Sequence, residues 1–355
     1  PCITYTPPSL GIIAEITSPP RDANAYAEFL EFFLDTHGNH FEYIELWNEP
    51  NNRSCYDYIL DESWDIFSSM IIGASGIVKK HGKKSVLGGI SPINPGWIKI
   101  MGDKKVLDHI DVVGIHGYPD VYDSRWRSWE ESIDSIQNAL DLYGSKAEIW
   151  ITETGYSTWR YDERKQVEKF ISVLDTLIKR VYWLSLLDTP SKVSTRNGHH
   201  IDERDYHFGM LSEDYRPKLL YQLWSSGGID NVRRNKWMAS FRFNGSGRKE
   251  LPVLITGGAG FIGTNLANRL LDLGHSVYIF DNLSRPGVDN NLKWLKQKHK
   301  NNLRIIIADI RDRFLVEESV KHVSHVFHLA AQVAVTTSLI DPYYDYSVNA
   351  RGTLN

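Results

Sequence analysis

The sequence predicts an α/β protein with two successive parallel sheets. Apolar strand-like runs alternate with amphipathic helical stretches from residue 41 to 226, which is the pattern of a parallel α/β architecture. This periodicity stops in residues 225–250, a stretch rich in Gly, Ser, Asn and Arg, and a second alternating pattern follows it. The length of 355 residues is sufficient for two domains of ordinary size.

The first part of the chain is expected to alternate short apolar strands with longer helices. The predicted strands are FEYIELW (41–47), KSVLGGI (84–90), HIDVVGI (109–115), AEIWIT (147–152) and RVYWLSLL (180–187). The predicted helices lie at 24–37, 62–81, 95–102, 128–143, 161–179 and 216–225. Asn24 is expected to cap the first helix and Gly38 to end it.

Polar side chains follow the carboxyl ends of these strands. The first strand leads into Asn48 and Glu49, the third into His116 and Tyr118, and the fourth into Glu153. Parallel α/β barrels place their active sites at this edge of the sheet. Glu49 and Glu153 are about three strand-helix units apart, so we expect the two carboxylates to face each other across one opening.

Two facing carboxyl groups are what cleavage of a glycosidic bond requires. One group protonates the leaving oxygen, while the other attacks the anomeric carbon or activates a water molecule. The first must be neutral and the second ionised, so their surroundings must separate their pKa values. A single Glu after a strand is more commonly a loop cap or a surface ion pair, and the residues alone leave this alternative open.

The motif WNEPN followed by ITETG resembles the retaining glycoside hydrolases built on (β/α)8 barrels. The resemblance implies that Glu49 is the acid/base and that Glu153 is the nucleophile. It also implies that Asn48 contacts the sugar 2-hydroxyl. His116 or Tyr118 would support the nucleophile.

The beginning of the sequence departs from that family. YTPPS, at residues 5–9, resembles the end of the third barrel strand, so about 80 residues of a complete barrel would precede it at the usual unit size. We therefore expect residues 1–226 to form an incomplete TIM-type (β/α)8 barrel and the sequence to be an excerpt of a longer protein. A linker is expected at 227–249.

The second part of the chain opens with a Gly-rich turn between a strand and a helix. Gly257, Gly260 and Gly263 occupy the positions of a TGxxGxxG pattern. In such a turn the helix N-terminus presents N–H groups to a pyrophosphate, and glycines permit its close approach. The next strand ends at Asp281, whose carboxylate is placed to bind the ribose hydroxyls of NAD and to repel the 2′-phosphate of NADP. The alternative is a purely structural Gly-rich turn.

Residues 250–355 are therefore expected to form an incomplete Rossmann-type, doubly wound parallel sheet that binds NAD. The predicted strands are LPVLITG (251–257), SVYIFDN (276–282), NLRIIIAD (302–309) and HVFHLAA (325–331), and the predicted helices lie at 261–273, 288–299 and 314–321.

TGGAGFIG, FDNLSR, ADIRD and HLAAQ, in this order, resemble the extended short-chain dehydrogenases of the NAD-dependent epimerase/dehydratase family. The region is particularly similar to the branch of that family that contains the CDP-paratose 2-epimerases. This resemblance implies NAD as cofactor, a nucleotide sugar (a CDP-hexose) as substrate, a keto-sugar intermediate and a homodimer. Besides the three glycines and Asp281, the implied cofactor-binding residues are Phe261, Ile262, Asn282, Asp309, Ile310, Leu329, Ala330 and Ala331.

The YxxxK motif that carries proton transfer in this family is expected beyond residue 355. The YxxxK match in the sequence, Tyr161 to Lys165, precedes the Gly-rich turn, and we interpret it as a coincidence on a helix surface. Residues 1–355 are therefore expected to be inactive as an epimerase by themselves.

Composition excludes several other functions. A net charge of −4 without a long basic run argues against nucleic acid as a partner. Apolar runs fall short of the roughly 18 residues that a membrane span needs. The two cysteines fit a reducing, cytoplasmic location. His199, His200 and His207 lie in a polar loop without compact ligand spacing, so no metal site is expected.

Together these features predict a fusion of a glycoside-hydrolase-like domain with an NAD-dependent nucleotide-sugar epimerase. Two alternatives stay open. The protein could be primarily a retaining glycosidase with an accessory nucleotide-binding domain. The barrel could instead be a non-catalytic carbohydrate-binding module fused to an epimerase.

Overall fold

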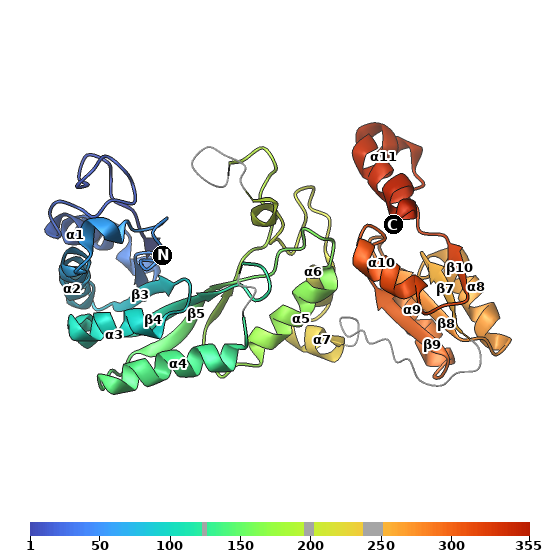
Figure 1. Cartoon of the computed structure of the whole chain (residues 1–355), viewed down its shortest axis with the longest axis horizontal. Coiled ribbons are helices and arrows are strands. Elements are labelled where there is room, and N and C mark those ends of the chain that lie inside the picture. Colours follow the sequence, from blue (N-terminus) through green and yellow to red (C-terminus); the bar gives the residue numbers. More distant parts are fainter. Residues whose placement is uncertain (123–125, 195–201, 237–250) are drawn as a thin grey trace. The chain divides into compact units, whose positions relative to one another are not determined.

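A computed structural model of the chain describes residues 1–122, 126–194, 202–236 and 251–355. It contains two parallel sheets, one of six strands and one of four, which confirms the predicted α/β class with parallel sheets (Figure 1). The chain divides into two compact units, residues 1–155 with 172–184 and residues 156–171 with 185–355.

The first sheet follows the order of the chain from β1 to β6. Its strands are β1 (Cys2–Ile3), β2 (Tyr43–Leu46), β3 (Lys84–Ile90), β4 (Val112–Gly117), β5 (Glu148–Thr154) and β6 (Val181–Trp183). Strands that are parallel and sequential in this way, with helices between them, form a half-barrel. That this half-barrel is part of a TIM-type barrel remains a prediction.

The helices of this part lie close to their predicted positions. They are α1 (Asn24–His37), α2 (Asp65–Lys80), α3 (Pro95–Asp103), α4 (Trp129–Leu142), α5 (Glu163–Leu174), α6 (Leu219–Ser225) and α7 (Gly228–Arg234). Short 3-10 helices occupy Gly38–His40, Tyr58–Asp61, Val106–His109 and Glu203–Tyr206.

The structure adds detail to the predicted start of α1, end of β6 and linker. Asn24 is not the cap of α1 but its first helical residue, and its N–H donates to the carboxylate of Asp22. Strand β6 ends earlier than predicted because the N–H of Ser185 donates instead to the carbonyl of Phe208. Helix α7 lies within the predicted linker, while residues 237–250 are outside the described residues, so the domain boundary stays a prediction.

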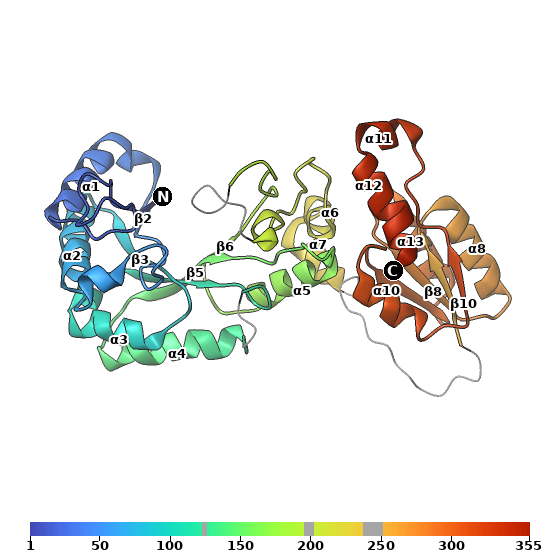
Figure 2. The ribbon, with the colours of Figure 1, turned by 45° about the horizontal axis from the view of Figure 1, so that its top comes forward.

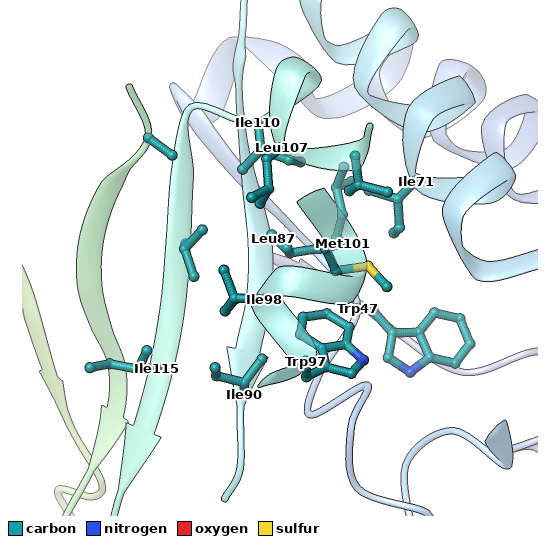
Figure 3. Packing of buried hydrophobic residues seen from close by; sticks show 14 of the residues in the cluster. Trp47, Ile71, Leu87, Ile90, Trp97, Ile98, Met101, Leu107, Ile110 and Ile115 are labelled. Carbon is teal, nitrogen blue, oxygen red and sulfur yellow. The ribbon is translucent and has the colours of Figure 1, made fainter. Parts of the chain in front are cut away.

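Helices α1 to α4 cover one face of the first sheet, and the main hydrophobic core lies between them (Figure 1). Figure 3 shows Trp97, Ile98 and Met101 of α3 beside Leu87 and Ile90 of β3. Each such fully buried side chain stabilises the fold by about 1.5–3 kcal/mol. This core fixes the positions of the strands whose ends carry the candidate site.

The opposite face of this sheet carries a small apolar layer. Val86, Val112 and Trp150 pack together there, with Tyr43 against them. Successive side chains of a strand point to opposite faces, so Glu45 follows Tyr43 on this face. A charged group therefore lies on the inner face of the half-barrel, directly above an apolar layer.

The second sheet has the strand order β10-β7-β8-β9. Its strands are β7 (Val253–Thr256), β8 (Val277–Asp281), β9 (Leu303–Ile307) and β10 (His325–His328). Its helices are α8 (Phe261–Asp272), α9 (Val288–Lys298), α10 (Arg313–Val320), α11 (Val335–Ile340), α12 (Pro342–Tyr346) and α13 (Gly352–Leu354), with a π-helix at Ser347–Arg351. The first strand of this region lies between the second and the fourth, which is the order of a doubly wound sheet.

Helices pack on both faces of the second sheet. Helix α8 packs on β7 and β8, and α9 packs on α8. Helix α10 lies on the other face (Figure 2). There Leu315 of α10 joins a core with Leu254, Phe280 and Ile306. The observed parallel sheet with helices on both faces agrees with the predicted Rossmann-type arrangement. Among the described helices of both units, none is long and apolar enough to cross a membrane.

The amino terminus of α2 provides a test of the fold. Asp61 is buried, and its carboxylate accepts the N–H groups of Ile66 and Phe67 and the hydroxyl of Tyr56, at 2.8–3.1 Å. We expect Asp61→Ala to lower the free energy of unfolding by about 2–4 kcal/mol, because it leaves these donors without an acceptor. Urea unfolding of the full chain measures this change.

The matched control is Asp65→Ala, which removes an exposed carboxylate from the same helix end. This change should have little effect on the unfolding midpoint. Equal losses in the two variants would contradict the assigned role of Asp61.

Candidate functional site

Three side chains selected from the sequence lie together at the carboxyl ends of β2, β4 and β5. Nδ1 of His116 is 3.1 Å from Oε1 of Glu49. One side-chain nitrogen or oxygen from each of His116, Glu49 and Glu153 lies within 4.8 Å of the other two. His116 is paired with Glu153 across β4 and β5, after a register shift that follows Ile115. We refer to Glu49, His116 and Glu153 as the carboxylate–histidine cluster.

The backbone holds Glu49 in an uncommon conformation. Its φ is +44°, and that of Trp47 is +77°, in the left-handed region that non-glycine residues rarely adopt. The N–H of Glu49 donates to the carbonyl of Gly89 at 3.0 Å, and Nδ2 of Asn52 donates to Oε2 of Glu49 at 2.9 Å. Such strained residues cost about 1–3 kcal/mol each and concentrate at functional sites.

Two glycines of β3 make room for this arrangement. A Cβ at Gly89 would lie 1.9 Å from Nε2 of His116, and a Cβ at Gly88 would lie 1.8 Å from the carbonyl oxygen of Trp47. Any side chain at these positions would collide with the histidine ring or with the backbone after β2. The GG pair in KSVLGGI is therefore required because the Trp47 backbone and the His116 ring approach β3 closely.

The pKa values of Glu49 and His116 shift in opposite directions. Burial raises the pKa of Glu49, but the hydrogen bond and charge of His116, with hydrogen bonds from Asn52 and Ser91, outweigh it and leave the pKa below its ordinary value. Burial opposes protonation of His116, but the hydrogen bond to Glu49 and the charges of Glu153, Glu49 and Glu45 raise its pKa overall. The pair therefore favours an imidazolium beside a carboxylate.

The pKa of Glu153 is raised. Burial is the main cause, and the negative charges of Glu49 and Glu45 add to it, while His116 offsets only part. A general acid at Glu49 would need the higher pKa of the two glutamates, so the directions in the ligand-free site are the reverse of what the implied roles require. The reason is that Glu49, rather than Glu153, has the hydrogen bond to His116.

The remaining predicted residues of this region lie around the cluster. Nδ2 of Asn48 is 3.9 Å from Sγ of Cys55, and Sγ is 3.7 Å from Oε2 of Glu49. Burial raises the pKa of the Cys55 thiol to about 11, and the charge of Glu49 adds to this effect. The ring of Tyr118 packs edge to face against Tyr122. Roles for Asn48 and Tyr118 stay predictions.

Sequence reasoning missed the other partners of Glu49. Asn52 lies three residues after Glu49, so its place in the same turn was a usable signal. The approach of Cys55 depends on how the loop folds back, and the sequence carries no simple signal for it.

No metal is assigned to the cluster. Its three residues lie close enough together to hold a cation, but Nδ1 of His116 is hydrogen-bonded to Glu49 in the structure. Elsewhere, Nε2 of His207 lies 2.9 Å from Oε1 of Glu203. His199 and His200 are outside the described residues.

In the second sheet, the Gly-rich turn has the geometry of a phosphate cradle. Gly257 has φ +67°, and a Cβ there would lie 2.7 Å from the N atom of Ala330. A Cβ at Gly263 would lie 2.4 Å from the carbonyl oxygen of Gly257. Helix α8 starts after Gly260, which has no side chain to cap it, so its first N–H groups are suited to an anionic ligand. The turn fits a dinucleotide.

The carboxylate of Asp281 is fixed beside this turn. It accepts the N–H of Ala259 at 3.0 Å and that of Leu283 at 2.9 Å. Burial raises the pKa of Asp281, and the two N–H groups offset only part of that effect. At the ends of β7 and β10, the Oγ1 atom of Thr256 accepts the N–H groups of Leu329 and Ala330 at 3.1 and 3.2 Å.

The side chain of Asp309 is buried, and its carboxylate is bonded to neighbouring side chains. Its two oxygens accept the N–H groups at Nε and Nη2 of Arg311 at 2.8 and 2.9 Å, and Nδ2 of Asn282 also donates to it at 2.9 Å. Burial raises the pKa of Asp309, but Arg311 outweighs it and lowers the pKa overall. Ile310 is also buried, whereas Phe261 and Ile262 are largely exposed on α8.

Comparison with known proteins finds a family match in the carboxyl-terminal part of the chain. A family described as GDP-mannose 4,6 dehydratase matches residues 254–355. CDP-paratose 2-epimerase of Salmonella typhi is 44% identical over 107 residues, which cover 30% of this chain and 31% of that protein. A putative UDP-glucose 4-epimerase of Methanocaldococcus jannaschii is 39% identical over 104 residues, 29% of this chain and 32% of that protein.

Among solved structures, the UDP-glucose 4-epimerase of Thermus thermophilus in complex with NAD is 37% identical. The match covers 29% of this chain and 32% of that one, with a TM-score of 0.26. The chain spans about a third of the length of the curated relatives it matches. The carboxyl-terminal part thus carries an epimerase/dehydratase-like region, and the comparisons give no support to a glycoside hydrolase barrel.

The hydrogen bond between His116 and Glu49 can be tested by NMR titration of the His116 ring. We expect the pKa of His116 to lie above the ordinary value of about 6.5 and to fall in Glu49→Gln, because glutamine supplies no negative charge. Glu42→Gln removes an exposed charge at the start of β2 and should leave the titration unchanged. The same His116 pKa in all three proteins would show that the bond does not set its protonation.

Proposed function

We propose that the first part of the chain is a retaining glycoside hydrolase and that residues 251–355 are the NAD-binding part of a nucleotide-sugar epimerase. The grouping of Glu49, His116 and Glu153 within 4.8 Å supports the first activity. The Gly-rich turn with Asp281 beside it, in a region related to epimerases, supports the second.

In the hydrolase, Glu49 protonates the leaving oxygen while Glu153 attacks the anomeric carbon, so the glycosidic bond breaks and a glycosyl ester forms. A water molecule then gives a proton to Glu49 and attacks the same carbon, which frees Glu153 and a sugar of the original anomeric configuration. Carboxyl groups of retaining enzymes lie about 5–5.5 Å apart and those of inverting enzymes about 6.5–9.5 Å. An oxygen of Glu49 within 4.8 Å of an oxygen of Glu153 supports the closer, retaining arrangement.

The proton for the first step comes from the His116–Glu49 pair. The raised pKa of His116 and the lowered pKa of Glu49 describe one proton held between Nδ1 and Oε1. Transfer of that proton to Glu49 leaves a neutral imidazole and a neutral acid, without a change in net charge. Glu49 can therefore act as an acid although its pKa in the free site is low.

In the epimerase part, the first turn of α8 binds the pyrophosphate and Asp281 binds the adenosine ribose. Asp309 and Ile310 would lie beside the adenine, and Nδ2 of Asn282 donates to Asp309. A nicotinamide bound there would supply the acceptor for a hydride from a sugar carbon and the donor for its return. The names of the relatives support a nucleotide sugar as substrate, and the similarity to CDP-paratose 2-epimerase supports a CDP-hexose.

A carbohydrate-binding barrel without catalysis is the second candidate. The reversed pKa directions of Glu49 and Glu153 favour it, because a site that never cleaves its ligand need not keep Glu49 as the more readily protonated group.

Hydrolysis of a panel of aryl glycosides by the full chain separates these two functions. We expect Glu153→Ala to lower kcat by about 10³-fold or more, and azide to restore turnover by replacing the lost nucleophile. Glu148→Ala, which removes an exposed carboxylate from the same strand, should stay near wild type. Sugar binding without hydrolysis in the wild-type chain would favour the binding module.

NAD binding by the full chain tests the second part. We expect Asp281→Asn to weaken NAD binding about tenfold or more and to reduce the preference for NAD over NADP, because the charge that meets the ribose hydroxyls is lost. Asp289→Asn, in the exposed ion pair with Lys293, is the control. Titration calorimetry measures both, and equal NAD affinity in the two variants would refute the assignment of Asp281.

A further inference from the structure

Glu45 is a partly buried glutamate in β2, and the proposed chemistry gives its carboxylate no role. It lies in β2 between Ile44 and Leu46, which are fully buried in the main core. Because side chains alternate along a strand, Glu45 points to the opposite face, where the apolar layer of Val86, Val112 and Trp150 lies. A charge in this position needs a specific partner.

That partner is the backbone of β3. Oε1 of Glu45 accepts the N–H of Gly89 at 2.8 Å. The carbonyl of the same Gly89 accepts the N–H of Glu49 at 3.0 Å. The ring of His116 lies so close to Gly89 that a Cβ there would be 1.9 Å from Nε2. One residue thus contacts Glu45, Glu49 and His116 at once.

We propose that Glu45 is a positioning residue that acts through Gly89: its carboxylate fixes the peptide that holds Glu49 and supports His116, and its negative charge retains the proton of the carboxylate–histidine cluster. The effect on catalysis rests on the proposed hydrolase function. The effect on the backbone and on His116 does not.

The charged and titratable groups around the cluster agree with this role. His116 is faced by Glu49 from the loop after β2, by Glu153 from β5 and by Glu45 from β2. On the far side of β2, Cys2 of β1 is paired with Glu45, and burial together with the charge of Glu45 raises the pKa of its thiol. Cys2 therefore stays a neutral thiol and adds no negative charge of its own beside Glu45.

A purely structural role for Glu45 makes a different prediction. If the side chain only bonded to Gly89, glutamine would serve as well, because its amide oxygen accepts the same N–H. Glu45→Gln keeps this acceptor and removes the charge, whereas Glu45→Ala removes both. Comparison of the two variants separates the bond from the charge.

The test is NMR of the full chain, with the ring of His116 and the amide of Gly89 as probes and Glu42→Gln as control. Glu45→Gln should lower the pKa of His116 by about 0.5 to 1 while Gly89 keeps slow amide exchange. Glu45→Ala should also speed exchange at Gly89. A His116 pKa that is unchanged in Glu45→Gln, or Gly89 exchange that is unchanged in Glu45→Ala, would overturn the proposal.

Hydrolysis measured on the same samples keeps the two proposals separate. If the wild-type chain cleaves aryl glycosides, Glu45→Gln should move the alkaline limb of the kcat/KM profile to lower pH, and an unmoved limb would count against Glu45. If the wild-type chain cleaves none of them while the pKa of His116 falls in Glu45→Gln, the role of Glu45 stands and the hydrolase function fails.

Discussion

The hydrogen bond between Nδ1 of His116 and Oε1 of Glu49 is the interaction on which the candidate site depends. It offsets the cost of burying the carboxylate and helps to lower the pKa of Glu49, whereas burial raises the pKa of Glu153. Without it, two glutamates in so small a space would repel each other, and one of them would take up a proton from solvent. The bond instead favours a protonated His116 beside an ionised Glu49.

The geometry of the parallel sheet makes this bond available. Three strands end at one edge, and the loop after β2 returns over β3 far enough for Glu49 to reach the end of β4. The approach is possible because β3 carries Gly88 and Gly89 where the loop and the histidine ring cross it. Glycine has the same role in the second sheet. Gly257 lets the turn after β7 lie close to Leu329 and Ala330, and Gly263 lets the start of α8 lie close to Gly257.

Local patterns in the sequence were sufficient to predict the strands and the polar residues that follow them. Strand β3 and helix α1 agree with prediction at both ends, because apolar runs and turn residues determine those limits. The bond from Gly89 to Glu45 joins residues 44 positions apart and depends on sheet register, which no local pattern records. The ion pair of Asp309 with Arg311 is only two residues apart, but a short polar motif does not reveal whether its carboxylate faces a ligand or a neighbour.

The central claim is that Glu49 and Glu153 act as a retaining pair held together by His116. The most direct test is the anomeric configuration of the first sugar released by the full chain, followed by proton NMR before mutarotation. A product with the configuration of the substrate is the predicted result, because an oxygen of Glu49 lies within 4.8 Å of an oxygen of Glu153, which favours the close carboxyl pair of a retaining enzyme. An inverted product would contradict the account.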